Sequence, residues 1–176
     1  KDASGLLIPE RVATLIPALK AALGGRPLQI HTHCNSGLAP YVVLQAVEYG
    51  VDVVHTATST LANGVSHSPT ERVTANLRRR GHDVRIDLAP VREVAERLAY
   101  IAEKEGKPVG TPNEYDEFHF LHQCPGGMVS NLAYQLETMG IKGRLEEILE
   151  EAWHVREDLG YPIVVSPFAQ YIVTQA

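Results

Sequence analysis

The sequence has 176 residues, enough for one domain with a sizeable core. Its net charge of −5 argues against a nucleic-acid partner, because nucleic-acid binders usually carry a basic surface. No apolar run approaches the roughly 18 residues that a transmembrane helix needs. Cys34 and Cys124 are far apart and form no disulfide pattern, so we expect a cytoplasmic protein.

The chain begins at Lys1, and its first residues read like the end of a strand. We therefore expect the sequence to be part of a longer protein. Apolar residues at helical spacing predict a helix from Pro9 to Leu23, ended by Gly24. On this stretch alone, Lys1 reads as a solvent-exposed residue just before a loop.

The stretch from Leu28 to His33 predicts a strand that ends in two histidines. Positions i and i+2 of a strand share one face, so His31 and His33 are placed to bind one divalent metal. The alternative is a pair of exposed histidines, or of histidines that form hydrogen bonds in a core. Gly37 and a helical pattern follow, which places the pair at the strand's C-terminal end.

Apolar strands and amphipathic helices then alternate, which predicts an α/β fold with a parallel sheet. This pattern fits part of an eight-fold barrel and also part of a doubly wound sheet. The polar loop from Thr58 to Pro69, which includes His67, should overhang the same rim as His31 and His33. It reads either as an ordinary loop or as a substrate or cofactor wall. The predicted strands are residues 51–57 and 84–88, and the predicted helices are 40–49, 70–80, 90–105 and 142–159, with a last one from Ser166-Pro167.

The last third of the chain offers two further groups of candidate residues. His119 and His122 have helical spacing, but nothing nearby completes a ligand set, so we interpret them as hydrogen-bonded residues at a packed edge. Pro125-Gly126-Gly127 predicts a tight turn that introduces a helix. Ser130 lies in the first turn of that helix, where a hydroxyl is most often a cap or a solvated group.

Several of these stretches, taken together, resemble one family. Lys1-Asp-x-x-Gly-Leu-Leu, His31-Thr-His33 with Gly37, and Pro125-Gly-Gly-Met-x-Ser-Asn-Leu occur in the order and spacing of a biotin-dependent carboxyltransferase domain. That family includes pyruvate carboxylase, the oxaloacetate decarboxylase α subunit and the transcarboxylase 5S subunit. The likeness covers essentially the whole chain, as the C-terminal part of that domain.

The resemblance implies a partial TIM (β/α)8 barrel, from about the end of strand 5 to helix 8, followed by the start of a C-terminal helical funnel. Residues 1–106 would be the C-terminal half of the barrel. Residues 107–176 would be an irregular segment and helices that lead into the helical region.

The resemblance also implies a site. A divalent metal (Zn, Mn or Co) would be held by a carboxylated Lys1, by His31 and His33, and by an Asp outside this sequence. Ser130 would contact biotin and pass a proton between the pyruvate methyl group and the biotin ring nitrogen. The implied activity is carboxyl transfer between carboxybiotin and pyruvate through an enolate, as pyruvate carboxylation or oxaloacetate decarboxylation. The implied partners are pyruvate or oxaloacetate, a biotinyl carrier domain, and further copies of the same chain in a homo-oligomer.

Two other functions stay open at this point. A metal-dependent barrel lyase or synthase of the aldol or Claisen type shares the His-x-His strand, but we expect it to lack the carboxylated lysine and the Pro-Gly-Gly-Met segment. A truncated scaffold that only binds a biotinyl carrier is the non-catalytic alternative. Cys34-Asn35 stands where many members of the family have Asp-Thr. We expect residues 1–176 alone to be inactive.

Overall fold

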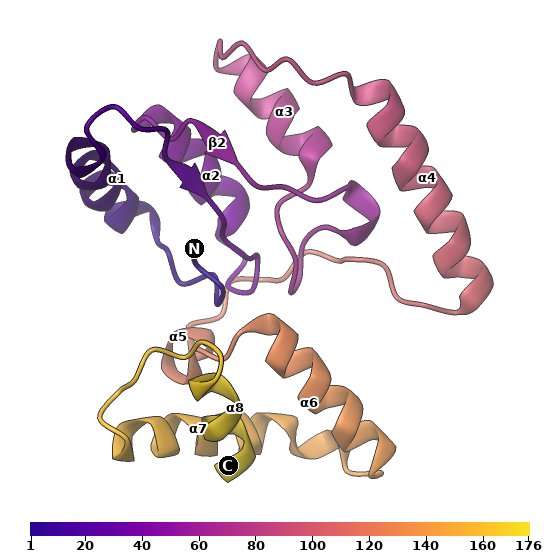
Figure 1. Cartoon of the computed structure of the whole chain (residues 1–176). Coiled ribbons are helices and arrows are strands. Elements are labelled where there is room, and N and C mark those ends of the chain that lie inside the picture. Colours follow the sequence, from indigo (N-terminus) through magenta and orange to yellow (C-terminus); the bar gives the residue numbers. More distant parts are fainter. The chain divides into compact units, whose positions relative to one another are not determined.

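The computed structural model describes residues 1–176, which form a mostly helical chain with few strands (Figure 1). The chain divides into two compact units, Lys1–Tyr115 and Asp116–Ala176. No helix has both the length and the apolar character required to cross a bilayer. The first unit contains α1 (Pro9–Leu23), β1 (Gln29–Ile30), α2 (Ala39–Glu48), β2 (Val53–Val54), the 3-10 helix η1 (Ser59–Leu61), α3 (Thr70–Arg79) and α4 (Leu88–Glu105).

The short sheet of the first unit is parallel. In the pairing of β1 with β2, Gln29 lies opposite Val53 and Ile30 opposite Val54. On the other side of the β1 chain, Asp2 forms a parallel bridge with Thr32. Three chain segments therefore run side by side in one direction, which agrees with the α/β prediction, although the strands are shorter than expected.

The helices of the first unit pack around this sheet, and their buried apolar side chains form two small cores. The apolar faces of α1 and α2 pack with the strand residues, and α3 packs on the opposite side of α2. The helical spacing of these residues puts them on one face of each helix, so their burial stabilises both helices at once. The first core contains Val12, Ile16, Ile30, Val42, Ala46 and Val51, and the second contains Val43, Leu44, Val73 and Leu77.

The strand predicted at residues 84–88 does not form. The guanidinium group of Arg78 donates hydrogen bonds to the carbonyl groups of Val84 (2.8 Å) and Ile86 (2.6 Å), and these are the acceptors that a sheet would use. Asp87 then caps α4, because its carboxylate accepts from the Ala89 N–H (2.9 Å). The prediction was wrong because the apolar pattern of this segment does not reveal whether a neighbouring strand is available to pair with it.

The second unit is entirely helical. Pro125 precedes α6, so the Pro-Gly-Gly segment opens a helix as expected. The apolar faces of three helices meet in one core with two residues from the connecting segments, and this core contains Cys124, Leu132, Leu136, Leu149, Ala152, Val164, Ala169 and Ile172. The elements are α5 (Phe118–His122), α6 (Gly126–Thr138), the 3-10 helix η2 (Lys142–Arg144), α7 (Leu145–Asp158) and α8 (Phe168–Gln175).

Candidate metal centre

The Lys1–Asp2 segment runs alongside the chain that carries His31 and His33. The Asp2 N–H donates to the His31 carbonyl (2.7 Å), and the His33 N–H donates to the Asp2 carbonyl (3.2 Å). Side chains alternate between the two faces of such a pairing. Lys1, His31 and His33 therefore share one face, and Asp2 and Thr32 share the other, where the Thr32 hydroxyl donates to the Asp2 carboxylate (2.7 Å).

The turn after Asp2 presses the backbone of Gly5 against that of His33. The Asp2 carboxylate accepts hydrogen bonds from the N–H groups of Leu6 (2.9 Å) and Leu7 (3.0 Å), which fixes this turn. Gly5 has a φ of +65°, and a Cβ atom there would overlap the carbonyl oxygen of His33. The position requires glycine, so the Lys-Asp-x-x-Gly spacing holds Lys1 and His33 on closely packed segments.

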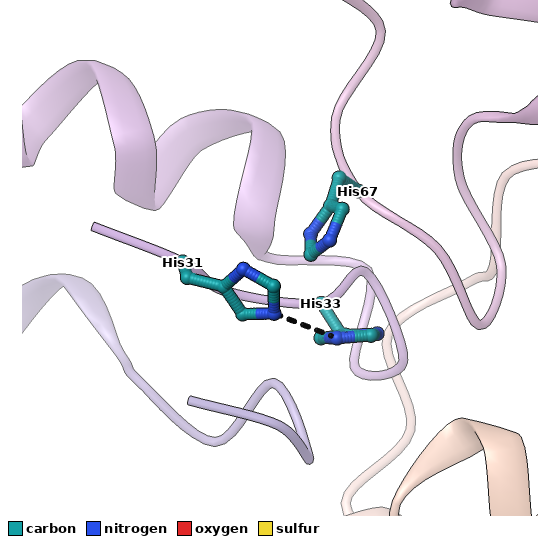
Figure 2. Close-up of side chains that lie close together, drawn as sticks. All are labelled: His31, His33 and His67. Atoms are coloured by element: carbon teal, nitrogen blue, oxygen red, sulfur yellow. Dashed lines mark hydrogen bonds between the residues drawn. The ribbon is translucent and has the colours of Figure 1, made fainter. Parts of the chain in front are cut away.

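Three imidazole rings gather at the end of these segments, as Figure 2 shows: those of His31, His33 and His67. Their potential ligand atoms all lie within 4.8 Å of one another. Nε2 of His33 lies 3.3 Å from Nε2 of His31. The ring centroid of His67 lies 4.3 Å from that of His31 and 4.4 Å from that of His33. We call these three residues the histidine cluster.

A chain of hydrogen bonds determines which nitrogen of His31 carries a hydrogen. The side-chain oxygen of Gln29 can only accept, so its contact with Nε2 of His55 (3.1 Å) assigns a hydrogen to that nitrogen. Nδ1 of a neutral His55 then accepts from Nδ1–H of His31 (3.0 Å). A neutral His31 is left with an unprotonated Nε2, the atom that faces His33.

His33 also presents an unprotonated Nε2. Its Nδ1 donates to the carbonyl of Val65 (2.7 Å), and a backbone carbonyl can only accept. In these neutral tautomers, the nitrogen atoms that face each other across 3.3 Å are both acceptors. Imidazoles that bind a metal show this pattern, with one nitrogen bonded to a carbonyl or another acceptor and the other directed at the ion.

The environment of His31 favours its neutral form. Burial, together with the neighbouring His67, His33, His55 and Lys1, lowers the pKa of His31 from 6.5 to about 4. At neutral pH the ring is therefore available as a ligand, since a protonated imidazole has no lone pair to donate.

The donor set fits a divalent metal. Zinc binds imidazole nitrogen at about 2.0–2.1 Å, and two such ligands on one tetrahedral ion stand slightly more than 3 Å apart. The 3.3 Å separation between the Nε2 atoms of His31 and His33 matches that requirement without rearrangement. Lys1 is exposed and lies on the face that carries both rings.

Ser130 belongs to the second unit, where it is exposed on the first turns of α6. Its hydroxyl donates to the carbonyl groups of Gly126 (3.0 Å) and Gly127 (3.2 Å), one helical turn earlier. The oxygen keeps lone pairs that can accept a proton or a hydrogen bond. The geometry is therefore that of a helix-bonded hydroxyl whose oxygen remains accessible.

His119 and His122 are buried in the second unit, and neither belongs to the group of residues that could hold a metal ion. Nδ1 of His122 accepts from the N–H of Cys124 (3.0 Å). Burial is the main cause that lowers the pKa of His122 to about 4 and raises that of the Cys124 thiol to about 11. The interpretation of these histidines as packed, hydrogen-bonded residues agrees with this arrangement.

The sequence pattern alone does not identify two residues of the site, His55 and His67. His67 lies in the loop that reads either as an ordinary loop or as a substrate or cofactor wall, and His55 lies within the strand predicted at residues 51–57. The strand register carries a signal for His55, because it follows Val54 as His31 follows Ile30. The position of His67 depends on a turn at residues 63–66, which the Asn63-Gly64 pair indicates, but the sequence does not show that this turn brings His67 to His31 and His33.

Comparisons with known proteins agree on one family. A family described as "Conserved carboxylase domain" matches residues 120–176. A pyruvate carboxylase subunit of Methanocaldococcus jannaschii is 39% identical over all of this chain, which covers 31% of that protein. The 2-oxoglutarate carboxylase large subunit of Hydrogenobacter thermophilus is 37% identical over the whole chain, which covers 27% of it.

A solved structure extends the likeness to the fold. The carboxyl transferase domain of Rhizobium etli pyruvate carboxylase, determined with pyruvate and biocytin, has a TM-score of 0.88 and 28% identity to this chain. The match covers 98% of this chain and 29% of that one, so this chain spans less than a third of each of these three relatives. Over its whole length the chain is therefore similar to a part of the carboxyltransferase domain of pyruvate carboxylase and its relatives, and residues 120–176 match the conserved carboxylase domain.

Proposed function

We propose that this chain is part of an enzyme that transfers a carboxyl group between biotin and a 2-oxo acid, with pyruvate and oxaloacetate as the uncarboxylated and carboxylated forms. The observation that carries the proposal is the pair of unprotonated Nε2 atoms of His31 and His33 beside Lys1, in a chain similar to a part of the carboxyltransferase domain. In this proposal residues 1–106, which lie within the first unit, form the C-terminal half of a TIM barrel. Residues 107–176 lead into a helical region, and the protein is a cytoplasmic homo-oligomer that works with a biotinyl carrier.

His31 and His33 would hold a divalent metal (Zn, Mn or Co) through Nε2, and Lys1, once carboxylated, would add oxygen ligands. A lysine carbamate is an anion, whereas the ammonium form of Lys1 would repel the ion. When bound, the metal would serve as a Lewis acid that stabilises the negative charge developing on the 2-oxo acid as an enolate forms. The two histidines contribute position, because backbone carbonyl and side-chain hydrogen bonds fix both rings.

Ser130 would act as the proton-transfer group. Its Oγ keeps lone pairs toward solvent, while its hydrogen is shared with the Gly126 and Gly127 carbonyls. To act, the hydroxyl would take a proton from the methyl carbon of pyruvate and give its own proton to the ring nitrogen of biotin, and it would reverse this exchange in the decarboxylation direction. The biotin group, when present, supplies or accepts the carboxyl group. A positioned acid–base group of this kind typically contributes roughly 10² to 10⁴ in rate.

The test is oxaloacetate decarboxylation by the protein at its full natural length, with and without free biotin, before and after metal removal. We expect activity that needs metal and is stimulated by biotin. S130A should lower the biotin-stimulated rate by roughly 10² or more, whereas S130T, which keeps a hydroxyl, should retain most of it. Metal content should be the same in both variants.

Other outcomes would redirect the assignment. Metal-dependent activity that biotin does not affect favours a lyase or synthase of the aldol or Claisen type. A fully metallated protein without activity favours a scaffold that binds a biotinyl carrier. The assay should also compare carboxylation of pyruvate with that of 2-oxoglutarate, because one relative is a 2-oxoglutarate carboxylase.

A further inference from the structure

We propose that His67 supplies a third imidazole to the metal held by His31 and His33, so that the loop between η1 and α3 is itself a metal-binding element. The proposal rests on the metal centre of the proposed function and names a ligand that the His-x-His pattern does not contain. It follows from where the His67 ring lies, from which of its nitrogens is free, and from how its loop is held.

The His67 ring is in contact with both of the other imidazoles. Its centroid is nearly equidistant from that of His31 (4.3 Å) and that of His33 (4.4 Å), closer to each than these two are to one another (5.2 Å). Figure 2 shows the three rings around a common space, with His67 reaching it from a different segment of the chain. A ligand atom from each ring lies within 4.8 Å of the other two, so small side-chain rotations suffice to place all three on one ion.

The nitrogen of His67 that remains available to bind a metal is Nε2. Nδ1 of His67 donates to the carbonyl of Thr32 (2.9 Å), the residue between His31 and His33. Because a carbonyl can only accept, the neutral ring carries its hydrogen on Nδ1 and leaves Nε2 as an acceptor. His67 thus repeats the arrangement of His33, whose Nδ1 donates to the carbonyl of Val65.

The exchange between the two segments is reciprocal. The loop supplies the carbonyl that orients His33, and the strand supplies the carbonyl that orients His67. The Cys34 N–H also donates to the Ser66 carbonyl (2.8 Å), so three hydrogen bonds join consecutive residues of the loop to the segment that carries the pair.

A tight turn presents His67 to the strand. Asn63 (φ +68°) and Gly64 (φ +52°) are both left-handed, and the Ser66 N–H donates to the Asn63 carbonyl (2.8 Å). The Asn63 N–H donates to the His67 carbonyl (2.7 Å), which closes the turn around the ligand residue. The backbone of His67 is therefore held on both sides before any metal binds, which lowers the entropy lost on binding.

A third imidazole changes which metals the site prefers. Nitrogen-rich sites favour Zn²⁺ and Co²⁺, whereas Mn²⁺ is better matched by oxygen ligands. We therefore expect His67 to shift the preference of this centre toward Co²⁺ and Zn²⁺. Its removal should weaken Co²⁺ binding more than Mn²⁺ binding.

The experiment is a Co²⁺ titration of the metal-free protein at its full natural length, followed by visible absorption and by competition with a chelator. H67N replaces the imidazole by an amide whose Nδ2–H can still donate to the Thr32 carbonyl in place of Nδ1, and it removes Nε2. We expect H67N to weaken Co²⁺ binding by roughly 10- to 1,000-fold, to alter the visible bands, and to weaken Mn²⁺ binding less. H33A should abolish Co²⁺ binding, and H154A, at an exposed histidine on α7, should leave it unchanged.

The outcomes separate the inference from the proposed function. If H33A loses Co²⁺ while H67N keeps the wild-type affinity and spectrum, His67 is not a ligand and the metal centre still stands. If H33A binds Co²⁺ as the wild type does, the centre itself is wrong, and the inference with it. X-ray absorption of the Co²⁺-loaded wild type provides a test without a substitution: three imidazole ligands support the inference, and two overturn it.

Discussion

Each unit of the chain contains a group of histidines, and their hydrogen bonds run in opposite directions. In the histidine cluster of the first unit, Nδ1 of His33 and Nδ1 of His67 donate to carbonyl groups, which leaves Nε2 free. In the second unit, Nδ1 of His122 accepts from the Cys124 N–H, so the hydrogen of the neutral ring is on Nε2. The first arrangement presents lone pairs to a shared space, and the second uses its lone pair to satisfy the backbone.

Burial and a lowered pKa therefore do not by themselves identify a metal ligand. His31 and His122 both have a pKa of about 4, and burial is the first cause in each case. Their roles differ because of which partner takes the lone pair: Nε2 of His31 faces an imidazole nitrogen of His33, whereas Nδ1 of His122 accepts from the Cys124 N–H.

The largest effect should follow removal of the ligand pair. H31N/H33N should lose bound metal almost completely, since even outer partners of metal ligands typically contribute roughly 10- to 100-fold in affinity. The matched variant H119N/H122N removes two histidines of the second unit and should keep full metal content. Metal analysis of both variants after gel filtration checks this. Metal loss from H119N/H122N alone would contradict the placement of the ligand pair in the first unit.

The second effect is a pH dependence of stability that arises from His122. Its pKa is about 4 in the folded protein against 6.5 as the ordinary value, so below pH 6.5 the unfolded chain binds a proton that the folded chain does not. Stability contributed by His122 is therefore complete above pH 6.5 and falls as the pH drops toward 4, by about 3 kcal/mol in all. Trp153, the single tryptophan, lies on α7 and reports unfolding of this unit.

H122N is the control for that measurement. Asparagine can still accept from the Cys124 N–H but does not titrate, so the variant should lose less stability than the wild type between pH 7 and pH 4.5. Urea unfolding followed by Trp153 fluorescence at the two pH values gives the comparison. Equal losses in wild type and variant would mean that His122 does not carry this pH dependence.

A third effect should come from the close packing behind His33. G5A places a side chain at φ +65° and against the His33 carbonyl, and should cost about 1–3 kcal/mol of stability as well as weakening metal binding. Gly24 has a similar φ of +57° with open space around it. G24A should therefore share the backbone strain and leave metal affinity unchanged, as chelator competition will show. Equal metal affinities in the two variants would argue against this packing as a support of the site.

The smallest effect concerns His55, which holds the tautomer of His31. H55F removes the acceptor for Nδ1–H of His31 and should lower metal affinity by roughly 10- to 100-fold, as expected for an outer partner. The control is H82F, because His82 belongs to the same unit and is paired with Glu48. H82F should leave the metal affinity unchanged. An unaltered affinity in H55F would show that His31 needs no such partner.

The sequence predicted the features that depend on local pattern. The helix from Pro9 to Leu23 begins and ends as its apolar spacing, proline and glycine indicate. The placement of His31 and His33 on one face followed from strand periodicity, which the bridge of Asp2 with Thr32 preserves.

The features that the sequence did not predict depend on particular side-chain and tertiary contacts. The segment from Val84 to Leu88 has the composition of a strand, but Arg78 takes its carbonyl groups. His67 reaches the cluster because residues 63–66 form a left-handed turn, and His55 reaches it through the register of β1 with β2. The bonds of His55 to His31 and of His67 to Thr32 join residues 24 and 35 positions apart, and no local period reports any of these contacts.

The most direct test of the central claim is anomalous diffraction from crystals of the Co²⁺-loaded protein at its full natural length. We predict one strong anomalous peak within coordination distance of Nε2 of His31 and Nε2 of His33. A metal-loaded protein whose anomalous peak lies elsewhere, with both of these nitrogens unliganded, would contradict the assignment of this site.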